Sequence, residues 1–162
     1  MLTKDLFKTL FAYHWMTTLL MIESTAELSD TDLQEESSYG YGSILDLLFH
    51  LLNADNGWRI GLETGKQSKG IDQKEYADLV SLRNGFEREK QAWNKLLEGL
   101  EEEQIGGVIK LTNRRGNVIP FQYWRILQHL ILHGMQHHSE LAQHLTAKDC
   151  SPGNIDFIFY SE

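Results

Sequence analysis

Five of the seven histidines lie in one 16-residue stretch, HLILHGMQHHSELAQH. Within it, His129, His133 and His137 follow each other four residues apart, close to one turn of an α-helix. At about 100° per residue, these three and His144 fall within an arc of about 80°, whereas His138 points about 100° away from His137. Four imidazoles on one stripe are more than chance placement explains. The stretch therefore predicts a helix with one histidine-rich face, whose imidazoles could bind a metal ion or exchange protons.

Two imidazoles one turn apart can chelate a single metal ion through one ring nitrogen each. The outer members of the row, His129 and His137, are about 12 Å apart along the helix axis, so only one adjacent pair should bind. The third ligand must then come from another helix, where the chain offers His14 and His50. We favour His50, which lies among leucines in LLFHLLNADNGW. Three imidazoles would leave a position for water or substrate, as in catalytic metal sites.

Other interpretations of the stretch are weaker. A zinc-protease motif is absent, because Gly134 and not a glutamate follows His133. Glu140, Asp46 and Asp55 are the candidates for a base or for a residue that orients a ligand, although the default expectation for Glu140 is a solvated surface position. A pH-sensitive surface would use histidines near their ordinary pKa and would not need a histidine in the middle of another helix. A purely structural helix would have to bury imidazoles among apolar groups without a partner, which is costly.

Periodic apolar residues predict four long helices that would position these histidines, over residues 3–28, 44–62, 73–100 and 121–146. Between the last two, the segments IGGVIKL and VIPFQY flank the turn TNRRGN and predict a small β-hairpin. The fold class is therefore all-α, a four-helix bundle with a hairpin, in one domain over residues 1–162.

Local signals refine this scheme. Ser43 with Asp46 predicts a capped start for the second helix, and Gly65 predicts its end. The segment SDTDLQEE predicts a short capped turn of helix or a loop, and the acidic run 101–103 a solvated helix end. The connection between the second and third helices is about ten residues, so these two need not be close antiparallel neighbours.

Composition narrows the classes of function. The 162 residues carry a formal charge of −8, and the one adjacent basic pair is Arg114-Arg115, which argues against a nucleic-acid partner. The apolar N-terminal segment is interrupted by charges, so we expect neither a signal peptide nor a membrane partner. The single cysteine, Cys150, lies in the predicted loop KDCSPG and favours a reducing compartment, so we expect a cytoplasmic protein.

Four segments carry a resemblance to the DinB/YfiT-like family of metal-binding four-helix bundles. LFAYHWMTTLLMIESTAELSDTDL resembles the family's first helix and the turn after it, and GSILDLLFHLLNADNGW resembles its second helix with a ligand histidine. TNRRGNVIPFQYWRILQHLILHGMQHHSELAQHL resembles the hairpin and the histidine-rich helix, and SPGNIDFIFY resembles the tail. The resemblance covers almost the whole chain, and it implies an up-down-down-up order of the four helices.

The resemblance also implies a site. Its metal ligands would be His50, His133 and His137, whereas His129 matches a common histidine of the family that does not bind the metal. The chain departs from the family at residues 138–140, where His-Ser-Glu replaces the usual Arg-Gly-Gln.

The resemblance further implies a homodimer with one divalent metal ion. The ion could be Zn, Ni or Fe, because three imidazoles suit all of them. Some relatives are transferases or isomerases that use low-molecular-weight thiols, and others are described as hydrolases. We therefore expect a metal-dependent enzyme that transfers a thiol to a small electrophilic substrate. The alternatives are a metal-dependent hydrolase or a non-catalytic metal-binding stress protein. Trp15, Trp58 and Trp124 are equally suited to the core and to the wall of a pocket.

Overall fold

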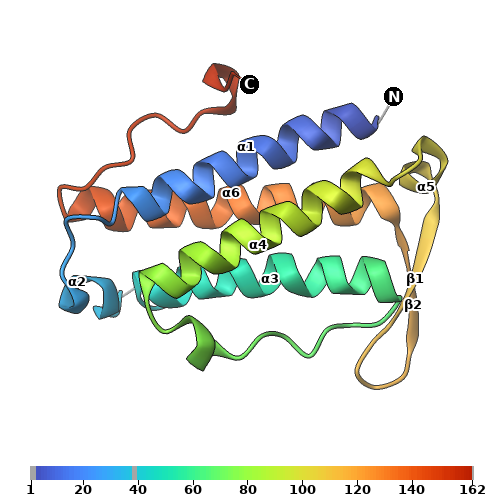
Figure 1. Ribbon diagram of the computed structural model, residues 1–162, viewed down its shortest axis with the longest axis horizontal. Coiled ribbons are helices and arrows are strands. Elements are labelled where there is room, and N and C mark those ends of the chain that lie inside the picture. Colours follow the sequence, from blue (N-terminus) through green and yellow to red (C-terminus); the bar gives the residue numbers. More distant parts are fainter. Residues whose placement is uncertain (1–2, 38–39, 162) are drawn as a thin grey trace.

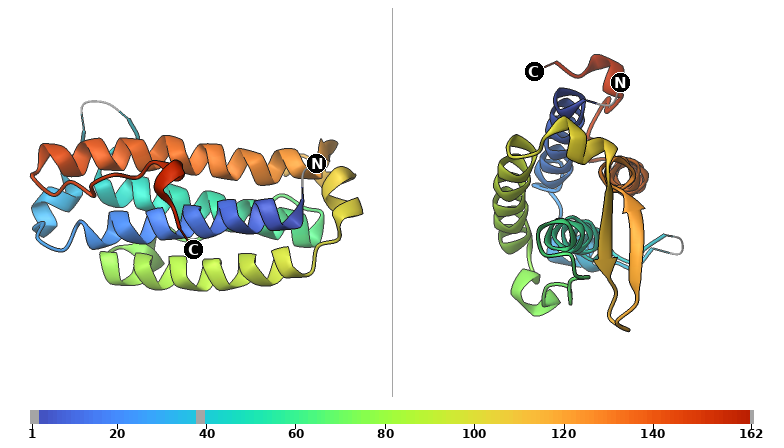
Figure 2. Two further views of the ribbon diagram at one scale, coloured as in Figure 1. Left: turned by 90° about the horizontal axis from the view of Figure 1, so that it is seen from above. Right: turned by 90° about the vertical axis from the view of Figure 1, so that its right-hand side faces the viewer.

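The computed structural model describes residues 3–37 and 40–161 and is built from four long helices. These are α1 (Lys4–Glu23), α3 (Ile44–Thr64), α4 (Leu79–Glu98) and α6 (Tyr123–Ala147). Seen end-on, they stand at the corners of a square, in which α1 and α3 lie on one diagonal and α4 and α6 on the other (Figure 2). The predicted four-helix bundle is confirmed.

The direction of the helices follows from the connections between them. In Figure 1, α1 and α6 run one way along the bundle, and α3 and α4 run the other way. The long segment 65–78 carries the chain back along the bundle, so α4 starts at the same end as α3 and lies parallel to it. This is the up-down-down-up order. The two helices do pack together, as parallel neighbours.

The start and end of α3 are set by the residues that the sequence indicated. The hydroxyl of Ser43 accepts from the backbone N–H of Asp46, and the Asp46 carboxylate accepts from the Ser43 N–H, which completes a capping box. Gly65 ends the helix with a φ of 70°, a left-handed conformation that glycine adopts without steric cost. The same reciprocal cap, between Ser29 and Asp32, starts the short helix α2 (Asp30–Gln34).

Two predicted helices are shorter than expected. The first ends at Glu23 and not near residue 28. Directly after Glu23, the hydroxyls of Ser24 and Thr25 donate to the carbonyls of Leu20 and Ile22, and these hydrogen bonds compete with continuation of the helix. The third is divided into a 3₁₀ turn, η1 (Gln73–Tyr76), and α4, because the side chain of Asp78 accepts from the Ser81 N–H and starts a new helix.

The acidic run after α4 also differs from its prediction. Instead of ending the long helix as a solvated tail, Glu101 is the N-cap residue of a further short helix, α5 (Glu102–Gly106). Three acidic residues at the start of a helix suit the positive end of its dipole.

The hairpin lies between α5 and α6, as predicted. β1 (Val108–Thr112) pairs antiparallel with β2 (Val118–Gln122), and Lys110 faces Pro120 in the register. β2 continues directly into α6, so the predicted helix start at residue 121 was two residues too early. The hairpin closes one end of the bundle (Figure 1).

The core runs along the centre of the bundle and is mostly aromatic and aliphatic. Trp93 from α4 is fully buried and stacks on Phe11 from α1, with ring centroids 4.7 Å apart. Trp15 is buried as well, which places it in the core and not in the wall of a pocket. Among the helices of the described residues, none is long and apolar enough to cross a bilayer.

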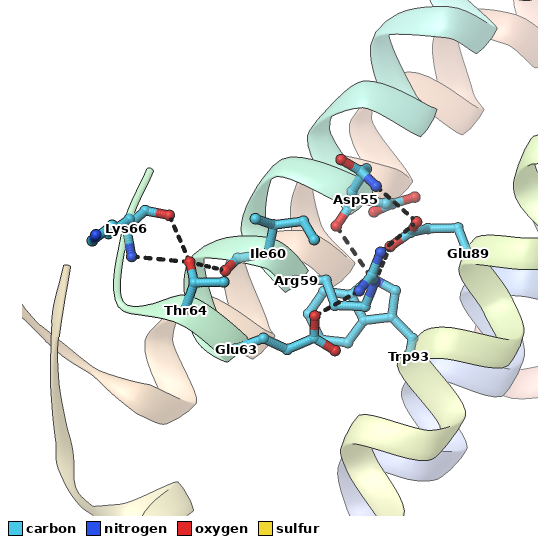
Figure 3. Close-up of polar contacts among 9 residues, drawn as sticks. Asp55, Arg59, Ile60, Glu63, Thr64, Lys66, Glu89 and Trp93 are labelled. Carbon is cyan, nitrogen blue, oxygen red and sulfur yellow. Dashed lines mark hydrogen bonds and ion pairs between the residues drawn. The ribbon is translucent and has the colours of Figure 1, made fainter. Parts of the chain in front are cut away.

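A polar cluster ties α3 to α4 on one side of this core (Figure 3). Arg59 of α3 donates to the buried carboxylate of Glu89 on α4 and also pairs with Glu63 one turn along its own helix. The indole N–H of Trp93 donates to the backbone carbonyl of Asp55 at 3.2 Å. These contacts hold α3 in place on the side opposite to its histidine.

The chain after α6 returns along α1. The hydroxyl of Tyr13 donates to the backbone carbonyl of Ile155, and its ring lies edge-on to Phe157 with centroids 5.0 Å apart. The short 3₁₀ turn η2 (Phe157–Phe159) is therefore attached to the bundle through Tyr13. The tail thus packs back on the bundle.

Candidate metal centre

The side chains of His50, His133 and His137 meet between two neighbouring antiparallel helices. His50 comes from α3, and the other two come from consecutive turns of α6. One ring nitrogen from each lies within 4.8 Å of the others, and Nε2 of His50 is 3.1 Å from Nε2 of His133. Among the described residues, this is the one group of histidine, cysteine or carboxylate side chains whose spacing could hold a metal ion. The structure thus brings together the three residues predicted as ligands.

The surroundings favour the uncharged form of His133 and His50. Burial, and next to it the neighbouring imidazoles of His137 and His50, whose positive charges would repel, together lower the pKa of His133 to about 4. The pKa of His50 is also lowered, mainly by burial and then by His137. A neutral imidazole has a free lone pair on one ring nitrogen, which is the form that binds a metal ion.

Glu140 fixes the orientation of His137. Its Oε2 lies 2.7 Å from Nδ1 of His137, so Nδ1–H donates to the carboxylate and Nε2 keeps its lone pair. The expectation that Glu140 is a solvated surface residue was therefore wrong. The i, i+3 spacing on a helix was the available signal, because it places the two side chains side by side.

The loop before α3 covers this carboxylate. Gly40 has a φ of 82°, and a side chain there would collide with Glu140, whose Oε1 lies 2.1 Å from an ideal Cβ position. Tyr41 stacks on His50 with ring centroids 3.8 Å apart and lies edge-on to His137. Sequence reasoning missed the contacts of this segment with Glu140 and His137, which join residues about 100 positions apart.

Two other histidines are buried behind the site and serve a different purpose. Nε2 of His14 lies 3.1 Å from the carboxylate of Asp55, and Nε2 of His138 lies 2.8 Å from the hydroxyl of Thr18. Because that hydroxyl already donates to the His14 carbonyl, His138 must donate from Nε2. Burial holds the pKa of His138 well below its usual value. His14, considered as a third ligand, lies outside the cluster and links α1 to α3.

The remaining candidates are accounted for by local contacts. His129 is exposed and lies edge-on to Trp58, with centroids 5.5 Å apart, and it is outside the three-histidine group. Asp46 caps α3, and Asp55 bonds to His14, so neither contacts the three histidines through a hydrogen bond. His144 is buried in the last turns of α6. Cys150 is a free thiol, half-buried after that helix.

The donor set fits a divalent ion. Three imidazoles on two helices, with one ring oriented by a carboxylate, match the ligand types and the supporting contacts of zinc, nickel or iron sites. Three protein ligands leave at least one coordination position for a small molecule. The cluster could therefore hold a metal ion in an arrangement of the catalytic type.

Comparison with solved structures shows the same fold. YfiT from Bacillus subtilis, described as a probable metal-dependent hydrolase with an unusual four-helix bundle topology, superposes with a TM-score of 0.71 at 12% sequence identity, over 92% of this chain and 91% of that chain. A DinB-like protein of Bacillus subtilis, YjoA, superposes with a TM-score of 0.64 at 18% identity, over 86% of this chain and 92% of its own. At these identities the likeness is one of fold.

Comparison at the level of sequence is more specific. Among curated protein sequences, none matches this chain. The model of the DinB family, however, matches residues 1–161, which is nearly the whole length. The chain therefore belongs to the DinB family.

Proposed function

We propose that this protein is a metal-dependent enzyme that holds one divalent ion through His50, His133 and His137 and transfers a low-molecular-weight thiol to an electrophilic substrate. The observation that supports it most strongly is the convergence of three imidazoles, with one ring nitrogen of each within 4.8 Å of the others. Membership of the DinB family adds to it. Zinc, nickel and iron are the candidate ions, because three imidazoles do not discriminate among them.

The ion would supply one chemical effect, a lowered pKa for a thiol or water that completes its coordination. The residues of the chain supply the rest. Glu140 holds the ring of His137, burial keeps the rings of His50 and His133 neutral, and Tyr41 shields one face of His50. In the transfer, the thiol proton passes to solvent, sulfur bonds to the electrophilic carbon, and the leaving group departs with its bonding electrons.

A thiol suits this site better than water does. Hydrolysis by an activated water is normally helped by a general base within hydrogen-bond reach. Within residues 3–37 and 40–161, the hydrogen bonds of the three histidines involve one carboxylate, that of Glu140, and it is already engaged at 2.7 Å with His137. A thiol, by contrast, is acidic enough to lose its proton near a metal ion without a dedicated base.

Hydrolysis is the second candidate, favoured by the description of YfiT as a probable metal-dependent hydrolase. The two reactions are separated by assaying metal-loaded protein with cysteine and 1-chloro-2,4-dinitrobenzene, and separately with p-nitrophenyl acetate and no thiol. Thiol transfer predicts release of chloride and formation of the thioether in the first assay. It also predicts loss of that turnover in His133→Ala and its retention in His129→Ala, the matched control on the same helix face.

Turnover of the ester alone would replace thiol transfer with hydrolysis. A bound metal with no turnover in either assay would favour a non-catalytic metal-binding protein. The homodimer and the cytoplasmic location stay predictions, which sedimentation velocity and cell fractionation would test.

A further inference from the structure

A pocket of about 340 Å³ lies beside the candidate metal centre, between α3, the segment 67–70 and the hairpin. This volume suits a small organic molecule, since ligand pockets are typically about 300–1,000 Å³. Its walls include the rings of Trp58 and Phe121, which meet edge-to-face with centroids 6.0 Å apart. The side chains of Leu111 and Ile119 add apolar surface from the hairpin.

The pocket opens on the face of α3 that carries the proposed ligand His50. Five residues of α3 line it, Asn53, Ala54, Gly57, Trp58 and Gly61, and they lie three to eleven residues after His50. At about 100° per residue they point within about 80° of its direction, on both sides of it, and at 1.5 Å per residue they lie roughly 5–17 Å further along the axis. From the other side, Trp58 contacts His129, whose ring centroid is 5.6 Å from that of His133. The pocket and the three histidines therefore lie next to each other along the same face of α3.

Two glycines keep this space open. A Cβ added to Gly57 would meet no atom within 4 Å, and one added to Gly61 would make ordinary contacts with Leu111 at 3.7 Å and with the carbonyl oxygen of Lys66 at 3.9 Å. Glycine within a helix costs about 1 kcal/mol of stability relative to alanine. The packing of the described residues does not require a glycine at position 57. The effect of this glycine is therefore to leave the pocket volume unfilled.

The charges around the pocket favour an anion. The two segments that form its outer wall, 67–70 and 111–121, contain three cationic side chains and no acidic one, although the whole chain has a formal charge of −8. Arg114 lines the pocket, where its Nε and Nη2 donate to the backbone carbonyl of Ser68. A guanidinium held in this way is positioned at the rim and is well suited to carboxylate or phosphate groups.

We propose that the α3–hairpin pocket binds a small organic anion with a flat apolar body, and that this molecule is the electrophilic substrate, with its reactive end toward the three histidines. The apolar body lies against the wall that Trp58 and Phe121 form together, and the acidic group faces Arg114. The second half of the proposal rests on the proposed function, whereas binding of the anion in the pocket does not.

The test is a calorimetric titration of the full chain with 2-naphthoate and with its neutral counterpart 2-naphthylmethanol. We expect the wild type to bind the carboxylate at least tenfold more tightly than the alcohol. Gly57→Leu should lose more than tenfold in affinity for both, because the new side chain fills the open volume without a clash. Gly106→Leu, whose Cβ also meets no atom within 4 Å but lies away from the pocket, is the matched control and should bind as the wild type does.

Arg114→Gln separates charge from shape, and it should weaken binding of the carboxylate to the level of the alcohol while leaving the alcohol unchanged. Wild-type protein that binds neither probe, or Gly57→Leu that binds both as well as the wild type, would overturn the proposal.

The same titration with His133→Ala separates this proposal from the proposed function. If the wild type and His133→Ala both bind the probe and elemental analysis finds no metal in either, the pocket proposal stands and the metal-dependent function is overturned. One equivalent of metal in the wild type with no probe binding would overturn the pocket and leave the metal centre standing.

Discussion

Glu140 shows how a single residue can tune a metal centre that it does not enter. Its carboxylate accepts from Nδ1 of His137 at 2.7 Å, which both selects the tautomer and makes Nε2 a better donor to a metal ion. At this position the DinB resemblance gives glutamine, whose side-chain oxygen can accept the same hydrogen bond without a negative charge. The chain therefore has a more strongly oriented His137 than the resemblance alone would imply.

The first prediction follows from this contact. Glu140→Gln should weaken zinc binding a few-fold, and Glu140→Ala about 10–100-fold, because the alanine variant loses the hydrogen bond as well as the charge. Competition titration with a chromogenic chelator measures both affinities. Glu103→Gln, an exposed carboxylate on α5, is the control and should bind zinc as the wild type does. Equal affinities for Glu140→Ala and the wild type would rule out the orienting role.

The second prediction concerns the stability of metal-free protein in acid. The pKa of His133 is about 4 in the folded chain and about 6.5 when unfolded, so below pH 6.5 the unfolded state takes up the proton first. The free energy of unfolding should therefore fall between pH 7.5 and pH 5.0, by about 1–2 kcal/mol from this group. The carboxylates of Asp32 and Asp78, whose pKa values are lowered below 3.8, titrate outside this window.

Urea unfolding at the two pH values measures the effect. His133→Asn, which cannot take up the proton, should show a shallower dependence on pH than the wild type. Identical slopes for the two proteins would show that His133 is not held neutral by its surroundings.

At the scale of the elements, the close approach of α1 and α6 depends on Gly134. An ideal Cβ on this residue would lie 2.3 Å from Nδ1 of His14, so no side chain fits between the two helices. His14 cannot easily move away, because its Nε2 bonds to the buried Asp55 carboxylate. Gly134, which lies between His133 and His137, thus has a packing role: it allows α6, the helix that carries the histidine row, to pack closely against α1.

The third prediction is that Gly134→Ala destabilises the fold by about 1–3 kcal/mol, the usual cost of overpacking a tight core. This outcome is opposite to the gain that alanine normally brings within a helix. Gly106→Ala, where the added carbon meets no atom within 4 Å, should leave stability unchanged or slightly raised. Thermal unfolding of both variants checks the pair, and a Gly134→Ala protein as stable as the wild type would contradict the contact.

The elements also show how far sequence reasoning reaches. The four-helix bundle, the hairpin and the caps of α3 were predictable, because apolar periodicity and capping residues are local patterns. The meeting of three histidines in the structure agrees with the ligand set that the family resemblance implied. Periodicity alone could not select between the two adjacent pairs of the row or place the third histidine, because that choice depends on how α3 packs against α6.

The contacts that sequence reasoning missed are of another kind. Glu140 beneath Gly40, Tyr41 against His137, and His138 on Thr18 each join residues about 90–120 positions apart. No repeating pattern marks such pairs. The break between η1 and α4 was missed for a different reason, since a single capping aspartate overrode an apolar row that continued across it.

At the scale of the whole molecule, the three histidines connect two helices that already pack together. A metal ion that binds only the folded arrangement stabilises it by RT ln(1 + [L]/Kd), about 2.7 kcal/mol at a hundredfold excess over Kd. The ion would thus join α3 to α6 at mid-height of the bundle without being needed to form the core.

The fourth prediction is therefore a metal-dependent rise in the midpoint of thermal unfolding. At a hundredfold excess of zinc or nickel over Kd, the wild type should gain about 5–10 °C. His129→Ala should gain as much, because its ring lies outside the three-histidine group. His133→Ala should gain nothing, and an equal rise in that variant would show that the added metal binds elsewhere.

The most direct test of the account is elemental analysis of the purified, untagged wild type beside His133→Ala and His129→Ala. We predict about one equivalent of divalent metal in the wild type and in His129→Ala after incubation with zinc, nickel or iron and desalting. We predict a loss of that equivalent in His133→Ala with its folded circular dichroism spectrum retained. No metal retained by the wild type under any of these conditions would contradict the metal centre and every reaction proposed at it.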